Sequence, residues 1–332
     1  MRRILILLLA FILVSVCGSW GFLVHRTVNQ LAVYELPKNL QRFFHSHRAY
    51  LVKESVRPDE RRQEDPLEAS RHFIDFEAYG DSAAWKMPWS WNAAAAAYSS
   101  DTLLKYGYVP YVVMTVKDRL TEAFRRKNTD SILFHAADLG HYVGDMHVPL
   151  HTTLNYNGQL TGQVGLHSLW ESMIPELEIK NYDLSSRHKA TYLREPEKQV
   201  WAAVRHAFEL TNNVFALERE VTKSFSPEQK YRTQMRRGKE VKSYTADFAR
   251  AYSKRLENTV NEQLISSADL LADLWLTSWI DAGRPDLSGM SLVPYRGQQK
   301  RQLKSEVKLF RKNDLLPKGL LLSQSAQSGE AE

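Results

Sequence analysis

The sequence predicts an all-α protein built as a single multi-helix domain. Apolar residues recur at helical spacing over three long segments, from about Tyr111 to Arg126, Glu195 to Thr222 and Tyr244 to Ile280. We find no strand-like alternation of any length and no internal repeat in the sequence. With 332 residues, 43% of them hydrophobic, the chain is long enough to bury a substantial core.

Shorter elements are expected between and before these segments. A first helix follows Trp20 and ends near Leu36, and Pro37 begins a second one, because proline suits the first turn of a helix. A charged loop contains Pro58 to Arg62. The last two long segments are joined by a basic connector that includes Arg236 and Lys242.

The first 19 residues are typical of a secretory signal peptide. Arg2 and Arg3 precede an apolar run from Ile4 to Val16, and small residues follow it. The run is too short to span a bilayer comfortably. We therefore expect an exported protein, periplasmic or secreted, whose mature chain begins at Trp20 and has no transmembrane span.

Cys17 is the only cysteine, and it offers an alternative reading of this segment as a lipoprotein anchor. The bulky Val16 just before it argues against lipidation. Cleavage after Ser19 leaves a mature chain without cysteine, which can form no disulfide even in an oxidising compartment. Bound metal would cross-link distant parts of the mature chain in place of disulfides.

The net charge of +6 falls to +4 once Arg2 and Arg3 leave with the signal peptide. That surplus favours an anionic partner, nucleic acid or phospholipid headgroups, and no obligate protein partner is evident. Over residues 286–332 the helical periodicity fades. The segment from Arg296 to Lys318 contains eight basic residues but only two acidic ones, Glu306 and Asp314. We expect this basic tail to be disordered, a solvated extension rather than a polyanion-binding arm.

The stretch from His141 to Glu171 carries the strongest chemical signal. His141 and Asp145 are four residues apart, as are His167 and Glu171, and His151 lies between the two pairs. A four-residue step places two side chains on one helical face, within reach of one ion. Imidazole nitrogen and carboxylate oxygen are donors that zinc accepts, so the stretch predicts a zinc site.

The helix that carries the first pair is expected to begin with Asp130 as its N-cap. Asp138 lies three residues before His141 and shares its face. We expect it to accept a hydrogen bond from a metal-bound imidazole.

Further residues match a known motif set. In chain order they are Trp20, His25, Asp59, the run His72-Phe73-Ile74-Asp75, the run from Gly144 to His151, and the pair His167 and Glu171. Over residues 20–171 the chain therefore resembles the zinc-dependent phospholipase C / S1-P1 nuclease superfamily. That resemblance implies a multi-helix fold, export, and phosphodiester hydrolysis with three Zn²⁺ ions.

The resemblance also implies how the ligands are shared. One zinc would be held by four side chains, Asp59, His72, His141 and Asp145. A second would be held by His151, His167 and Glu171. The third would be held by His25 and by the α-amine and carbonyl oxygen of an N-terminal Trp20, with Asp145 bridging it to the first.

These donors predict a hydrolytic mechanism on their own. Zinc ions that share a carboxylate also share a water, whose pKa falls to about 7, so hydroxide forms at neutral pH. Asp145 and Asp59 would hold the ions that activate this nucleophile. The resemblance to the nucleases implies that Arg62 adds positive charge to the transition state, and a surface arginine without a role in the site is the alternative. By the resemblance, Phe73 would stack on a nucleobase and Asp75 would bond to its edge, as in nucleases that act on single-stranded DNA or RNA.

Two alternatives remain open at this stage. Glu171 is the residue found in the phospholipases, and the usual Gly-Gly-Asn of the nucleases is absent, so zinc-dependent phospholipase C is the runner-up, with Trp85, Trp89 and Trp91 as its membrane contact. The second alternative is an exported binding protein that uses zinc only to fold. Structural zinc sites usually contain cysteine, which disfavours it.

Overall fold

The computed structural model describes residues 21–236, 239–291 and 296–324. It is mostly helical, which confirms the all-α prediction. None of the helices in these ranges is both long and apolar enough to cross a membrane. The signal peptide, Cys17 and Trp20 lie outside the described residues.

The helices of the first half carry most of the core. They are α1 (Phe22–Glu35), α2 (Lys38–Ser46), α3 (Arg48–Glu54), α4 (Arg57–Arg61), η1 (Ala69–Arg71), η2 (Phe76–Tyr79), α5 (Ala83–Lys86), α6 (Trp91–Tyr98), α7 (Ser100–Tyr106), α8 (Val109–Arg125) and α9 (Thr129–Asp145). Asn128, rather than Asp130, caps α9, because its side chain accepts from the amide of Ser131 at 2.9 Å.

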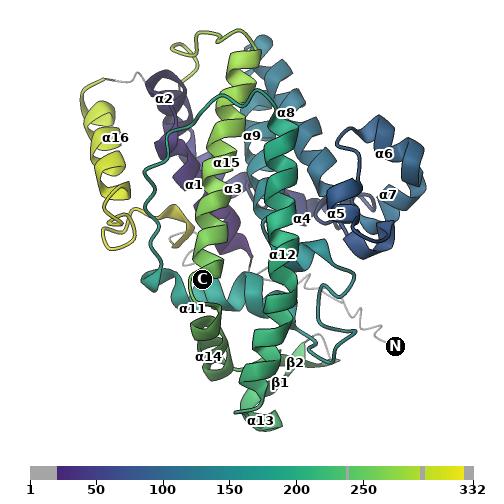
Figure 1. Ribbon diagram of the computed structural model, residues 1–332. Helices are drawn as coiled ribbons and strands as arrows, with labels where there is room; N and C mark the ends of the chain where they lie inside the picture. The colour runs from purple at the N-terminus through teal and green to yellow at the C-terminus, as the bar shows by residue number, and fades with distance from the viewer. Residues whose placement is uncertain (1–20, 237–238, 292–295, 325–332) are drawn as a thin grey trace, which may run out of the picture.

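The second half adds two long helices and several short ones. They are η3 (Pro149–Thr152), α10 (Leu166–Ser168), η4 (Leu169–Met173), α11 (Ile174–Glu178), η5 (Ile179–Asn181), α12 (Pro196–Thr222), α13 (Pro227–Lys230), α14 (Ala246–Leu256), α15 (Thr259–Asp281) and α16 (Gly297–Phe310). Figure 1 shows α12 and α15 running along the molecule, with α5, α6 and α7 on one side and α2 and α16 on the other.

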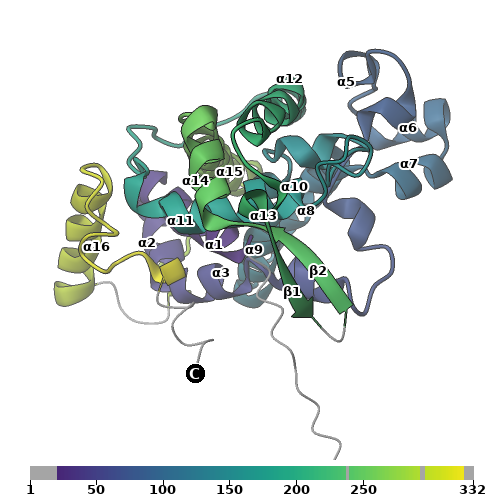
Figure 2. The ribbon, with the colours of Figure 1, turned by 90° about the horizontal axis from the view of Figure 1, so that it is seen from below.

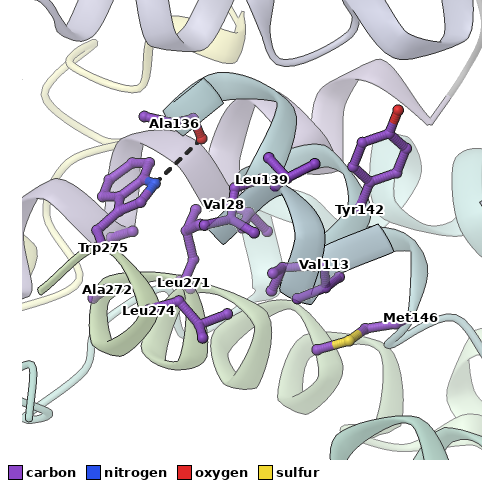
Figure 3. Packing of buried hydrophobic residues seen from close by; sticks show 14 of the residues in the cluster. Val28, Val113, Ala136, Leu139, Tyr142, Met146, Leu271, Ala272, Leu274 and Trp275 are labelled. Carbon is purple, nitrogen blue, oxygen red and sulfur yellow. Dashed lines mark hydrogen bonds between the residues drawn. The ribbon is translucent and has the colours of Figure 1, made fainter. Parts of the chain in front are cut away.

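The centre of the fold is a bundle in which α1, α8, α9 and α15 pack on one another. Its side chains come from all four helices, and Val28, Leu139 and Leu271 are fully buried among them. Figure 3 shows the indole of Trp275, from α15, donating to the carbonyl oxygen of Ala136 in α9 at 3.2 Å. This bundle fixes the end of α9 and the start of α1, which both reach the site described below.

A second hydrophobic cluster lies beyond the end of α9. It contains Val148, Leu150 and Trp170 together with residues of α12 and α14, such as Phe248. Since α12 also packs against η3 and α8, it ties this cluster to the bundle.

The basic connector contains a β-hairpin that the sequence did not predict. Strand β1 (Tyr231–Arg236) pairs antiparallel with β2 (Lys239–Tyr244), and the ribbon projects from the body in Figure 2. At the root of the ribbon Tyr244 is buried and Tyr231 packs on it, whereas the apolar side chains of Met235 and Val241 are exposed. Strands whose apolar residues are not buried need no apolar alternation, which is why the pattern was missing.

The expectation of a disordered tail is wrong for residues 297–324. Helix α16 packs against α1, and Leu303, Phe310, Leu315 and Leu321 are buried. Glu306 joins them as a buried carboxylate that accepts from the hydroxyl of Tyr34 at 3.0 Å and pairs with His45 at 2.9 Å. The apolar positions are too widely spaced, among exposed basic residues, to make a clear stripe in the sequence.

Replacing Phe310 by alanine tests this docking. The ring is 2% exposed and lies 5.4 Å from the ring of Tyr34, so Phe310→Ala should lower the free energy of unfolding by about 3–5 kcal/mol. Denaturant titration measures the change. Lys304→Ala, at an exposed position of the same helix, is the control, and equal stability of the two variants would contradict the packed arrangement.

Candidate metal centre

Six separate parts of the chain bring nine polar side chains to one place. They are the start of α1, α4, the segment after η1, the end of α9, η3 and the helical stretch from α10 to η4. The residues that predict a metal site and lie in the described part of the chain all reach it, namely His25, Asp59, His72, His141, Asp145, His151, His167 and Glu171. Arg62 lies beside them.

The first group of donors is Asp59, His72 and His141, with Asp145 against it. The Nδ1 atom of His72 lies 2.8 Å from Oδ2 of Asp145 and 3.8 Å from Oδ1 of Asp59. The Nε2 atom of His141 lies 3.2 Å from the same Asp145 oxygen. These atoms surround one point, although α4, η1 and α9 are far apart in the sequence.

The second group is His151, His167 and Glu171. Both imidazoles point their Nε2 atoms at Oε2 of Glu171, at 3.3 Å for His151 and 2.7 Å for His167. Glu171 lies in η4, a π-helical turn within the stretch from α10 to α11. Such single π-turns occur frequently at functional sites.

Asp145 lies between the two groups. Its Oδ1 atom is 3.5 Å from Nδ1 of His151 and 3.5 Å from Nε2 of His25. His25 forms a third donor group with Asp145 and His141, and its ring stacks on that of His141 with 4.0 Å between centroids. The carboxylate of Asp145 therefore contacts all three groups. Its Oδ2 atom lies near His72 and His141, and its Oδ1 atom lies near His25 and His151.

Two glycines allow the elements to approach this closely. A Cβ atom on Gly144 would lie 2.9 Å from Nδ1 of His25, so only glycine lets α9 and α1 meet here. A Cβ on Gly21 would lie 2.5 Å from Oε1 of Glu171. The described chain thus begins in contact with the second donor group.

The ring nitrogens of His141 and His72 that point away from the site also have partners. Nδ1 of His141 donates to the carbonyl oxygen of Ser55 at 2.8 Å, which leaves its Nε2 for the site. Nε2 of His72 lies 3.5 Å from the fully buried carboxylate of Glu68. Asp138 does not orient an imidazole, contrary to our expectation, because its two oxygens accept from Arg57 and Arg61.

The charges within the site stabilise one another. Burial lowers the pKa of His141, but the carboxylates of Asp145 and Asp59 outweigh it and raise that pKa to about 9. Burial raises the pKa of Asp145, yet the nearby histidines, His141 first, hold it well below its usual range. His25 differs, since burial and then His141 lower its pKa to about 4. Buried carboxylates are therefore ionised and require positive charge beside them.

The geometry fits zinc. Two donors at about 2.0–2.1 Å from one tetrahedral zinc ion lie about 3.3 Å apart. Oδ2 of Asp145 lies 3.2 Å from Nε2 of His141, and Oε2 of Glu171 lies 3.3 Å from Nε2 of His151. Nε2 of His151 also lies 2.8 Å from Nε2 of His167. Ring nitrogens and carboxylates converging in this way form a donor set that could hold metal.

The donors open into a cavity of about 500 Å³. Phe73, Asp75 and Arg62 line it together with six of the candidate donors, namely Asp59, His72, Asp145, His151, His167 and Glu171. Nη1 of Arg62 lies 3.3 Å from Oδ1 of Asp59. Burial, and then Glu77, raise the pKa of Asp75 to about 7. Tyr156 also lines the cavity and is 51% exposed.

Sequence reasoning missed Tyr156, and its position five residues after His151 was the only available signal. Phe73 lines the cavity next to Ile74, which forms an isolated antiparallel β-bridge with Gly107. A Cβ on Gly107 would meet the carbonyl oxygen of Phe73 at 2.3 Å, and the amide of Val109 donates to that oxygen at 3.1 Å. The backbone of Gly107 has a φ of +83°, which favours glycine in any case.

An all-helical domain with several His/Asp/Glu groups at the base of one cavity defines a class of metal-binding hydrolases. A family model for the S1/P1 nucleases matches residues 20–278. The chain belongs to the S1/P1 nuclease family, and nuclease-type phosphodiester hydrolysis is the activity that this membership supports. No curated protein gives a significant match to the sequence.

Removing one donor tests the second group. His167→Ala leaves only His151 and Glu171, so the protein should retain about one metal ion fewer per chain than the wild type. Elemental analysis after identical metal reconstitution measures this. His188→Ala is the control, because His188 pairs with Asp273 at 2.9 Å and belongs to none of the three donor groups. Unchanged metal content in His167→Ala would rule this group out as a ligand set.

Proposed function

We propose that this protein is an exported, zinc-dependent nuclease that cleaves single-stranded DNA or RNA. The observation that carries the proposal is the set of three donor groups around Asp145 at the base of a cavity that also exposes aromatic rings. Family membership supports the phosphodiesterase chemistry. Zinc, export and the choice of substrate are the proposed parts.

The proposed centre holds three zinc ions. Asp59, His72, His141 and Asp145 would bind the first, and His151, His167 and Glu171 the second. His25 and the N-terminal Trp20 would bind the third, with Asp145 bridging. Trp20 lies outside the described residues, but Gly21, which follows it, lines the cavity beside Glu171. A mature N-terminus at residue 20 would therefore begin at the site.

Zinc bound there would supply a water of lowered pKa and positive charge toward a phosphate. The chain supplies the arrangement around it. Asp145 keeps the donor groups together, and Asp59 holds the first group while accepting from Arg62. Because Arg62 is about half exposed at the cavity, its guanidinium can contact a phosphate oxygen and stabilise the charge of the transition state.

A single-stranded substrate suits the walls of the cavity. Phe73 and Tyr156 both line it and offer ring faces, and stacking on either is possible for any base. Asp75 lies in the same cavity, where its carboxyl group can accept a hydrogen bond from a base edge. A duplex keeps its bases stacked on each other, so these contacts favour unpaired strands.

Phospholipase C remains the second candidate because of two exposed tryptophans. Trp85 is 50% and Trp89 39% exposed, as a membrane contact would require. The three tryptophans do not form one platform, however. Trp85 packs edge-on against Phe208, whereas the ring of Trp91 packs on Tyr111. The cavity aromatics therefore favour the nuclease.

Comparing substrates separates these two candidates. Zinc-loaded protein should cleave single-stranded DNA and RNA, and Phe73→Ala should weaken that cleavage by about 1–3 kcal/mol, the value of one base stack, or roughly 5- to 150-fold in kcat/KM. A small phosphodiester without a base should be hydrolysed equally by both proteins, and a chelator should abolish all hydrolysis.

Tyr192→Ala, at an exposed position outside the cavity, is the matched control and should cleave DNA normally. Rapid turnover of phosphatidylcholine with no cleavage of either nucleic acid would favour the phospholipase. Zinc binding without any hydrolysis would favour a protein that uses zinc only to fold.

The N-terminal ligand has its own test. One extra residue before Trp20 converts the α-amine into an amide, which cannot bind zinc. Such a protein should lose about one zinc ion and most of its activity while its circular dichroism remains helical. N-terminal sequencing of exported protein should begin at Trp20. Full zinc content in the extended chain would refute the proposed ligand.

A further inference from the structure

A second cavity, of about 350 Å³, lies on the far side of Tyr142 from the metal centre. The ring of Tyr142 separates the two, since its centroid is 5.5 Å from that of His72 and 5.6 Å from that of His141. Helices α8 and α9 and the segment from Arg61 to Arg71 form the walls. The two cavities have no lining residue in common.

Three arginines and two carboxylates, those of Asp65 and Asp138, line this second cavity. Arg61, Arg71 and Arg119 reach it from three different elements. Arg61 is paired with Asp138 at 2.8 Å, and Arg71 with Asp65 at 3.1 Å.

The carboxylates around these arginines are shared. Asp138 also accepts from Arg57 at 2.5 Å, and Glu68 pairs with both Arg61 and Arg71. Arg57 is also paired with Glu54 at 3.4 Å, so Arg57, Arg61 and Arg71 all have carboxylate partners. Arg119 has neither a hydrogen bond nor an ion pair within the described ranges, so its guanidinium is the unpaired one at this cavity.

His135 lies beside that unpaired charge and lines the same cavity. Its ring makes no hydrogen bond or ion pair to any described residue. Burial lowers the pKa of His135, and Arg119 and Arg57 lower it further against the opposing effect of Asp138. A neutral imidazole that can donate one N–H thus lines the cavity beside Arg119.

Apart from Thr115, the rest of the lining is apolar or aromatic. Val112 and Val116 come from α8, and Tyr108 and Phe134 add ring surface. Phe134 is 37% exposed even though the guanidinium of Arg57 lies 3.8 Å from its centroid. A volume of about 350 Å³ is near the lower limit for small-molecule sites, of about 300–1,000 Å³, and exceeds what a bare phosphate requires.

We propose that this second cavity binds a phosphomonoester dianion, with Arg119, Arg71 and His135 on the phosphate and Tyr108 and Phe134 beside the attached group. A guanidinium matches two phosphate oxygens at once, so unpaired Arg119 is the expected anchor. The site is separate from the proposed catalytic centre and does not depend on it. Hydrolysis of a phosphodiester does release a phosphomonoester, which would place such a ligand nearby.

Calorimetric titration of the full-length, zinc-loaded protein tests the site. Inorganic phosphate and adenosine 5′-monophosphate are titrated separately into the wild type and Arg119→Gln. The variant should lose one binding event, or bind at least about tenfold more weakly, because a charge-assisted bidentate contact is removed. Tighter binding of the nucleotide than of phosphate would show that the aromatic wall contributes, and equal binding that the phosphate alone is recognised.

Arg126→Gln is the matched control, since Arg126 follows the last residue of α8, is exposed and is paired with Glu122 outside the second cavity. It should bind both anions like the wild type. Arg119→Gln should also hydrolyse a small phosphodiester at the wild-type rate, because it lies outside the catalytic cavity. Unchanged anion binding in Arg119→Gln, or loss of hydrolysis together with binding, would overturn the proposal.

Discussion

The carboxylate of Asp145 is the feature on which the rest of the site depends. It is 2% exposed and lies within 3.5 Å of ring nitrogens from four histidines, His25, His72, His141 and His151. A buried carboxylate is costly unless cations or donors surround it. The fold meets that requirement by directing α1, η1, α9 and η3 to the same point.

The site also lies where the two hydrophobic clusters meet. His25, His141 and Asp145 extend from helices of the central bundle, with Leu23 and Val143 in its core. His151, His167 and Glu171 are held by the second cluster, through Leu150, Leu166 and Trp170. Metal bound between them would join two separately packed regions, so its binding energy would also stabilise the fold. Such binding would take the place of disulfides in a chain that has one cysteine, located in the predicted signal peptide.

Tyr142 and Glu68 separate the metal centre from the arginine-rich cavity behind it. The hydroxyl of Tyr142 donates to Glu68, which is fully buried and also lies 3.5 Å from Nε2 of His72. Arg61 and Arg71 neutralise Glu68 from the other side. The carboxylate of Glu68 thus contacts His72 of the candidate metal centre and pairs with Arg61 and Arg71 of the second cavity. A group of donors suited to cations and a cavity lined by arginines can therefore lie next to each other.

The sequence by itself determined the helical class and identified the candidate donor residues that the structure brings together. Ligand chemistry depends on residue type, and a four-residue step such as His141 to Asp145 or His167 to Glu171 is a local geometric fact of a helix. The tertiary structure decided what depends on distant contacts. In the structure Tyr156 lines the cavity, and Asp138 pairs with Arg57 and Arg61 instead of contacting an imidazole. The tertiary structure also packed Phe310 against α1 and left Met235 and Val241 of the hairpin exposed, because burial, unlike spacing, is set by which elements meet.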